Sequence, residues 1–458
     1  RLCLTGSSCG DLFHQNLLQA AAVQALLDLA PLTAGTPSKV LLGLPLAVGD
    51  EVFDGVALLS SGQVQALMVA PWPDSPALSP SVRLPEKAQL KIGDKFFTLT
   101  TNQPFLFGKV EILLGHQTPG EVETDLLINL INLPALAPAE DAPQTAFDPA
   151  ARLGITVICS AGASESTTDQ VFSGKAEIWQ EGQCLAAAPE LSFVTQIVQA
   201  VCEPKENFTR PSLITEKVDD QPNRFPFINS KEPEKQFARL LEIQSSGLMR
   251  RLLHTHQRKV ILGLSGGADS SHALLVCCRA FDRMGLDRKD ILVIHMPGPG
   301  SSYSSRERST SLADLAGVTQ RTIPIGPAVL AHLEDIGHPA GLHDVTFENA
   351  QARERTQILM DLANQQNALV VGTGDLSEIA LGWCTFNGDH MSMYDVNCGL
   401  PKTLLLRLLV WAGKFLFGQA GESIAQKIAL APISPELLPL DEAGHSTQKT
   451  EEVLGPYE

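Results

Sequence analysis

One short stretch in the middle of the chain combines residue types that suit phosphate binding. It runs from Lys259 to Ser271 and reads KVILGLSGGADSS. Gly266 and Gly267 permit a backbone geometry that a side chain would block, so that N–H groups can face an anion. Asp269 would repel a bound phosphate unless a cation lay between them, which indicates Mg²⁺.

The flanking residues predict a strand before this loop and a helix after it. Val260 to Leu264 reads as a buried parallel strand, and an apolar-periodic helix begins near Ser270. A strand, a glycine loop and a helix offer an anion a row of N–H groups and the positive end of a helix dipole. For SGG alone, a tight turn that binds nothing is an alternative, but SGGxDS directly after a strand is a stronger signal.

From residue 259 onward, predicted strands and helices alternate. The strands cover 259–264, 290–296, 320–325 and 368–373, and the helices cover 270–285, 306–316 and 347–366. This alternation predicts a parallel, doubly wound sheet with helices on both faces. In such a sheet, ligands bind at the carboxyl ends of the strands.

The helix expected at 347–366 carries a second candidate binding group. Asn349 and Arg353 are four residues apart and therefore share one helix face. An amide beside a guanidinium suits a ribose or a phosphate. A solvated helix face, with Arg355 paired to Glu354 or to another carboxylate, is the alternative.

A third candidate group follows the last of these strands. Thr373 can approach an adenine or a phosphate where the strand ends. Asp375 is expected to cap a short helix, and Glu378 on that helix would complete an Mg²⁺ site with Asp269.

Two aromatic residues come directly after this third group. Trp383 and Phe386 would stack on a nicotinate or adenine ring, and core packing is the alternative.

Composition limits the classes of function. The chain has 458 residues, 44% hydrophobic and 19% charged, which is typical of a globular protein of two or three domains. Its net charge of −17 argues against nucleic-acid binding. The nine cysteines include no CxxC pair, which predicts a reduced, cytoplasmic protein without structural zinc.

The apolar stretch 404–417 contains Arg407 and Lys414 and is too short to span a bilayer, so we expect a core or interface helix and no membrane contact.

Residues 1 to about 200 predict a different architecture. A helix at 11–29 is followed by short strands with few long helices between them, typical of a layered sandwich. The strands are expected at 40–44, 56–60, 63–69, 96–101, 109–114, 125–132, 155–159 and 171–180. Residues 203–235 are polar and proline-rich, which is a linker composition.

Longer motifs carry a resemblance to a known family. SGGADS resembles the pyrophosphate-binding loop of the ATP pyrophosphatase superfamily. ENAQARERTQ at 348–357 and GTGDLSEIALGWCTFNGDHMSMY at 372–394 are more specific, and they are similar to NAD synthetases. LCLTGSSCGDLFHQ at 2–15, VLLGLPL at 40–46 and STTDQVFSG at 166–174 resemble the nitrilase-like glutaminase domain of glutamine-dependent NAD synthetases.

The resemblance implies an α/β protein with two domains. Residues 1–200 would form a nitrilase-like α-β-β-α sandwich, residues 201–235 a linker, and residues 236–458 a doubly wound, adenine nucleotide α-hydrolase-like synthetase domain. Because the chain starts at Arg1 inside a matched segment and stops at Glu458 without a closing element, we expect truncation at both ends. Relatives imply a homo-oligomer paired through the synthetase domains.

The glutaminase triad of the family is not matched. Its Glu, Lys and Cys positions read Arg1, Trp72 and Leu113 here, and a leucine cannot form a thioester. We therefore expect a pseudo-glutaminase. Replacement of the nucleophile by Cys3 or Cys9 is the alternative.

The implied reaction is the amidation of deamido-NAD, with ATP and Mg²⁺ as cofactors and ammonia, rather than the family's glutamine, as nitrogen donor. The ATP contacts carried over are Gly263, Leu264, Ser265, Gly266, Gly267, Ala268, Asp269, Ser270, Thr373 and Lys402. The deamido-NAD contacts are Asn349, Arg353, Glu378, Trp383, Cys384, Thr385 and Phe386, and the metal ligands are Asp269 and Glu378.

Other functions stay open on the sequence alone. The missing triad favours a catalytically silent, nucleotide-binding paralogue or subunit of an NAD synthetase assembly. A glutamine-dependent enzyme with an incomplete sequence and another ATP pyrophosphatase, such as a GMP synthetase, are further alternatives.

Overall fold

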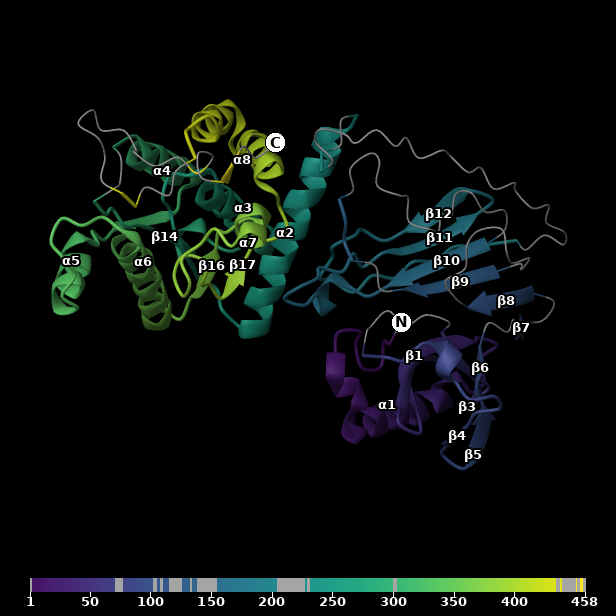
Figure 1. Cartoon of the computed structure of the whole chain (residues 1–458). Helices are drawn as coiled ribbons and strands as arrows, with labels where there is room; N and C mark the ends of the chain where they lie inside the picture. The colour runs from purple at the N-terminus through teal and green to yellow at the C-terminus, as the bar shows by residue number, and fades with distance from the viewer. Residues whose placement is uncertain are drawn as a thin grey trace. The chain divides into compact units, whose positions relative to one another are not determined.

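The computed structural model divides into two compact units (Figure 1). Unit 1 comprises Arg1–Ala135 and Pro143–Asp219, and unit 2 comprises Leu136–Ala142 and Asp220–Glu458. The described residues are 2–70, 77–101, 105–107, 110–114, 126–131, 134–137, 155–203, 227–228, 231–299, 303–433, 437–438, 450 and 454–455. The predicted linker falls largely outside them, so the predicted domain boundaries stay a prediction.

Unit 1 contains two larger sheets and a small hairpin. The first sheet has the order β1-β2-β3-β6, formed by Val40–Val48, Glu51–Ser60, Gln63–Val69 and Thr100–Thr101. The second has the order β12-β11-β10-β9-β8-β7, formed in that order by Gln183–Ala187, Ala176–Gln180, Ile155–Ser160, Leu126–Ile131, Val110–Leu114 and Phe105–Phe107. The hairpin pairs β4 (Gln89–Ile92) with β5 (Lys95–Thr98).

The central strand β2 explains why these elements form layers. Its residues from Val52 to Leu59 are all buried, as expected for a strand covered on both faces. Ala57 and Leu59 pack in a core with Leu26 of α1 (Asn16–Leu29). Val56 and Leu58 face the other way and pack with Leu130 of β9. The first sheet therefore lies between a helix and the second sheet.

The fold of unit 1 agrees with the predicted nitrilase-like sandwich, with differences in detail. Within its described residues α1 is the one α-helix, so the second helical layer is not seen there. The expected strand 96–101 is wrong, because the chain changes sheets at Leu99 and makes β5 and then β6. The expected strand 171–180 begins only at Ala176.

Unit 2 is built on a parallel sheet, as predicted. Its order is β15-β14-β13-β16-β17, formed by Thr319–Thr322, Ile291–His295, Val260–Gly263, Leu369–Gly372 and Tyr394–Asp395. From β13 the chain moves outward through β14 to β15, and it then returns to place β16 on the other side of β13. The carboxyl ends of β13 and β16 therefore flank a topological switch point, where such sheets bind ligands.

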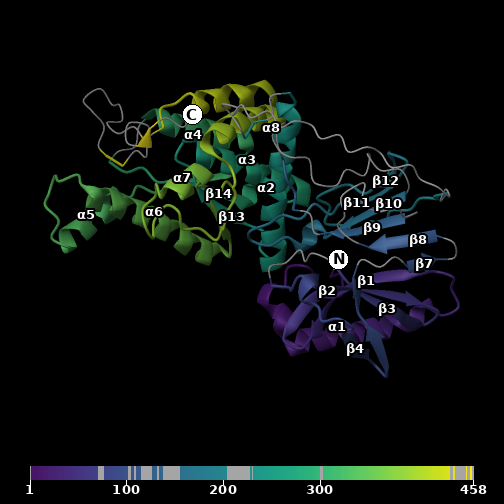
Figure 2. The ribbon, with the colours of Figure 1, turned by 45° about the vertical axis from the view of Figure 1, so that its right-hand side comes forward.

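Helices cover both faces of this sheet (Figure 2). One face packs against α5 (Gly326–Asp335) and α6 (Val345–Gln366) through a core that includes Ile261 and Val370. The other carries α3 (Ala268–Met284), which contacts α2 (Pro233–Thr255) and α8 (Lys402–Ala429). Helix α4 (Tyr303–Ala316) also contacts α8, and α7 (Leu376–Leu381) follows β16.

Helix α8 is longer than predicted and is bent in the middle. Among the described residues it is the one helix long and apolar enough to cross a membrane. Gly418 (φ 63°, ψ −148°) interrupts it, and each half is shorter than the roughly 20 residues that span a bilayer. The halves meet so closely at Gly413 and Gly421 that a Cβ on Gly421 would lie 2.1 Å from the Gly413 carbonyl oxygen. Helix α8 is therefore a core helix of unit 2.

This contact predicts that Gly421→Ala destabilises unit 2. The added methyl group meets main-chain atoms that cannot move independently, so we expect the free energy of unfolding to fall by about 1–3 kcal/mol. Gly326→Ala in α5 is the matched control, because a Cβ there meets nothing within 4 Å. Chemical denaturation of both variants measures the difference, and equal stability would contradict the packing described.

Candidate active site

The glycine loop after β13 has the predicted special geometry at Gly266 but not at Gly267, whose backbone is extended (φ −83°, ψ 167°). Gly266 has φ +88°, and a Cβ on it would lie 2.1 Å from the Ser305 carbonyl oxygen of α4. Gly267 is the N-cap of α3 and makes no side-chain cap, so the first N–H groups of this helix are left for a ligand. The hydroxyl oxygens of Ser265 and Ser270 lie 3.1 Å apart across the loop.

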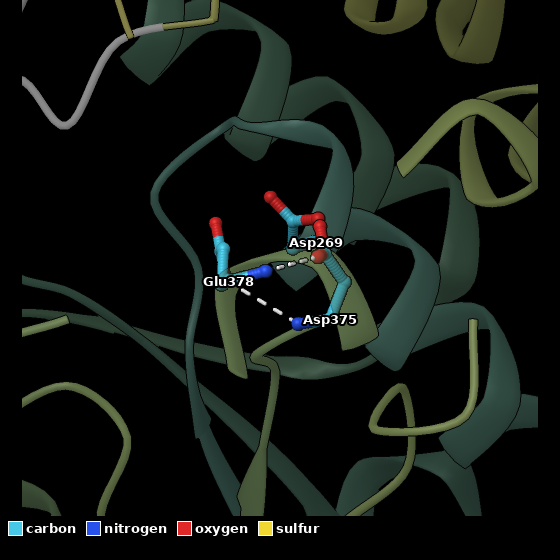
Figure 3. Close-up of side chains that lie close together, drawn as sticks. All are labelled: Asp269, Asp375 and Glu378. Atoms are coloured by element: carbon cyan, nitrogen blue, oxygen red, sulfur yellow. Dashed lines mark hydrogen bonds between the residues drawn. The ribbon is translucent and has the colours of Figure 1, made fainter. Parts of the chain in front are cut away.

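Lys402 joins this loop to the segment after β16. Its Nζ lies 2.7 Å from Asp269 Oδ1, 2.6 Å from Asp375 Oδ2 and 3.2 Å from Glu378 Oε1. Figure 3 shows the three carboxylates converging from α3 and α7. Lys402 itself begins α8 and is 1% exposed. We call Asp269, Asp375, Glu378 and Lys402 the acidic cluster.

Asp375 has two roles in the acidic cluster. It caps α7 as predicted, since its Oδ1 accepts a hydrogen bond of 2.9 Å from the Glu378 backbone N–H, and the Asp375 N–H returns one to Glu378 Oε2. Its other oxygen faces Lys402. The sequence suggested the cap but not the ion pair, because that contact joins helices α7 and α8.

Burial and mutual repulsion perturb the cluster's proton affinities. Burial raises the pKa of Glu378 to about 7, and the charges of Asp269 and Asp375 add to this. Burial also raises the pKa of Asp269, against the attraction of Lys402. Burial alone would lower the pKa of Lys402, but the three carboxylates outweigh it and raise the pKa. The ammonium group therefore stays protonated.

The donor set of the cluster fits a divalent cation. Oxygen atoms of the three carboxylates lie within 4.8 Å of one another. When all three are ionised, the Lys402 ammonium balances one of their three negative charges. The two that remain match the charge of a divalent cation, and carboxylate oxygens are the ligands that Mg²⁺ prefers. A divalent cation would relieve the repulsion that raises the pKa of Glu378.

A second group of predicted residues forms where α6 meets the loop after α7. The Thr385 hydroxyl donates to Asn349 Oδ1 at 2.8 Å, and Arg353 Nε donates to the Phe386 carbonyl at 3.3 Å. Phe386 is 82% exposed, so core packing is not its role, whereas Trp383 is half-buried. Cys384 is exposed.

Two residues that the sequence analysis missed hold this loop. Asp389 Oδ1 accepts a hydrogen bond of 2.7 Å from the Thr385 N–H, and His390 Nδ1 lies 2.8 Å from the Thr385 carbonyl oxygen. The polar run NGDH next to the aromatic residues was the available signal. The structure thus collects the predicted residues into two groups, while their binding roles stay predictions.

Of the three glutaminase positions, one lies within the described residues. Arg1 and Trp72 lie outside the described residues, and Leu113 pairs with Leu127 in the sheet. Burial, with the nearby charge of Glu165, raises the pKa of the Cys9 thiol, which disfavours a thiolate nucleophile. The Cys3 Sγ accepts a hydrogen bond from the Gly43 N–H at 3.3 Å.

A glycine loop and an acidic cluster at the switch point of a parallel sheet are the arrangement expected of a nucleotide-dependent enzyme, and comparison with known proteins agrees. The NAD synthase family model matches residues 241–457. The glutamine-dependent NAD(+) synthetase of Mycobacterium tuberculosis is 32% identical over 522 aligned residues, covering 100% of this chain and 75% of the relative. The chain belongs to the glutamine-dependent NAD(+) synthetase family, and it is therefore a ligase.

Solved structures show the shared fold. The glutamine-dependent NAD(+) synthetase from Cytophaga hutchinsonii matches with a TM-score of 0.72 and 18% identity, over 93% of this chain and 76% of the other. The enzyme from Acinetobacter baumannii, solved with adenosine diphosphate, matches with a TM-score of 0.66 and 20% identity, over 92% and 76%. The predicted family and fold class are confirmed.

The raised pKa of Glu378 predicts a pH-dependent stability. The folded protein retains the Glu378 proton up to about pH 7, while the unfolded chain releases it near the ordinary value of 4.5. The stabilising contribution is therefore complete below pH 4.5 and is lost as the pH rises to about 7. We expect Glu378→Gln to flatten this decline in denaturant titrations without ATP or divalent cations.

The exposed Glu334 of α5 provides the control, as Glu334→Gln should keep the wild-type pH profile. A Glu378→Gln profile parallel to that of the wild type would contradict the assignment.

Proposed function

We propose that this protein makes NAD by amidating deamido-NAD at the expense of ATP, with ammonia as its nitrogen donor. The observation that carries the proposal is the acidic cluster beside the SGGADS loop, in a chain of this family. The nicotinate carboxylate of deamido-NAD attacks the α-phosphate of ATP, and pyrophosphate leaves. Ammonia then displaces AMP from the adenylate, giving NAD.

ATP binds across the switch point in this proposal. Its phosphates meet the loop at residues 263–270 through the uncapped N–H groups at the start of α3 and the hydroxyls of Ser265 and Ser270, and its adenosine lies near Thr373. Lys402 supplies a positive charge that the acidic cluster keeps protonated and immobile. No residue forms a covalent bond, so catalysis rests on positioning and on charge stabilisation.

The proposed cofactor Mg²⁺ would be held by Asp269 and Glu378. When bound, it would offset the negative charge of the phosphates. Asp375 is fully buried and committed to the α7 cap and to Lys402, so it orients the cluster.

Deamido-NAD binds at the group around Asn349 and Arg353. Because Thr385 donates to Asn349 Oδ1, the Asn349 Nδ2 is left as a donor for the ligand. Arg353 supplies positive charge on the same helix face. The exposed ring of Phe386 offers a stacking surface for the nicotinate.

Ammonia is the proposed donor because the glutaminase triad is unmatched at Arg1, Trp72 and Leu113. The same observation supports a second candidate, a silent nucleotide-binding subunit of an NAD synthetase assembly. The proposal further includes a cytoplasmic location, consistent with free cysteines throughout the described residues, and a homo-oligomer paired through unit 2.

The proposal predicts NAD formation with ammonium and not with glutamine. Purified protein would receive deamido-NAD, ATP and Mg²⁺ with one nitrogen donor at a time, and NAD would be quantified by a coupled dehydrogenase. Replacing Mg²⁺ with a chelator should stop the reaction. Equal rates with both donors would refute the pseudo-glutaminase assignment, and no product from folded protein with either donor would favour the silent subunit.

A further inference from the structure

Three hydrogen-bonded polar side chains, two of them fully buried, adjoin the candidate active site. It consists of Asn397 between β17 and α8, Gln244 on α2 and His272 on α3. Asn397 and His272 are 0% exposed. None of the three belongs to the ligand contacts proposed above, so the reaction leaves their hydrogen-bond chain unexplained.

Asn397 connects the two segments that are expected to bind one ATP molecule. Its Nδ2 donates to the backbone carbonyl of Asp269 at 3.0 Å and to that of Thr373 at 3.0 Å. Asp269 lies in the first turn of α3, and Thr373 follows β16. Because carbonyl groups only accept hydrogen bonds, the nitrogen of the Asn397 amide must face them.

Gln244 and His272 enforce the same orientation from the other side. The Gln244 Nε2 donates to Asn397 Oδ1 at 3.3 Å and to the Val396 carbonyl at 2.7 Å. Gln244 Oε1 in turn lies 3.0 Å from His272 Nε2, which must then carry the proton. Burial lowers the pKa of His272 to about 3, so the ring is neutral at physiological pH. The hydrogen bonds therefore run in one direction, from the imidazole to the two backbone carbonyls.

We propose that Asn397 is a positioning residue for ATP: its two hydrogen bonds set the spacing between the phosphate-binding turn and the Thr373 turn. Gln244 and His272 keep the amide in its donating orientation. The inference rests on the proposed function, since it assumes that both turns contact the same nucleotide.

Asn397→Asp tests this directly. The variant has the same shape but turns a carboxylate oxygen toward two carbonyls, so the turns should separate. With ammonium as donor, we expect the KM for ATP to rise roughly 10-fold to 100-fold, while the KM for ammonium stays unchanged. A merely structural role would reduce the active fraction, and hence the apparent kcat, without moving the KM for ATP, and that result would overturn the proposal.

Two further variants complete the experiment. Asn364→Asp, at an exposed position of α6, adds the same charge and should keep the wild-type KM for ATP. Gln244→Met removes the donor to Asn397 at similar volume. If Asn397→Asp does not fold, the KM for ATP of this variant tests the proposal instead. A wild-type KM for ATP in folded Gln244→Met would then overturn the proposal.

Calorimetric titration with ATP and Mg²⁺ separates this inference from the proposed function. If the wild-type protein binds ATP but forms no NAD, the proposed function fails, and the inference is still judged by binding. Weaker ATP binding by Asn397→Asp than by Asn364→Asp supports it, and equal affinity overturns it.

Discussion

The ion cluster at Lys402 is the interaction on which the rest of the site depends. One buried ammonium group draws together carboxylates from the start of α3 and from both ends of the capping box of α7. Breaking a buried ion pair leaves an uncompensated charge, which costs about 3–5 kcal/mol. The cluster thus holds the starts of three helices in one place, and its surplus of negative charge leaves it suited to a cation that accompanies phosphates.

The sheet order is what makes this meeting possible. Because β13 and β16 are adjacent although more than one hundred residues separate them, the loops at their carboxyl ends face one another. Asn397 adds a second, neutral connection, through main-chain carbonyls rather than side chains. Charge attraction within the buried cluster and the directional hydrogen bonds of Asn397 therefore act on the same two turns.

Local patterns predicted the parts of this structure that depend on neighbouring residues. The strand, loop and helix at 260–271 could be predicted because glycine conformation and apolar periodicity are local, and the Asp375 cap follows a local rule. The ion pair between Asp375 and Lys402 could not, since it forms only when the start of α8 meets the start of α7 in the fold. Helix α5 and the two-residue strand β17 were missed, and the bend of α8 at Gly418 depends on how its halves pack.

The most direct test of the account is the exchange of labelled pyrophosphate into ATP without any nitrogen donor. If the site joins ATP to the nicotinate carboxylate, folded protein should catalyse this exchange with Mg²⁺ and only when deamido-NAD is present. The exchange reports the first chemical step alone, and it is independent of where ammonia comes from. Exchange that proceeds equally well without deamido-NAD, or no exchange when both substrates are bound, would contradict an adenylating site at Lys402.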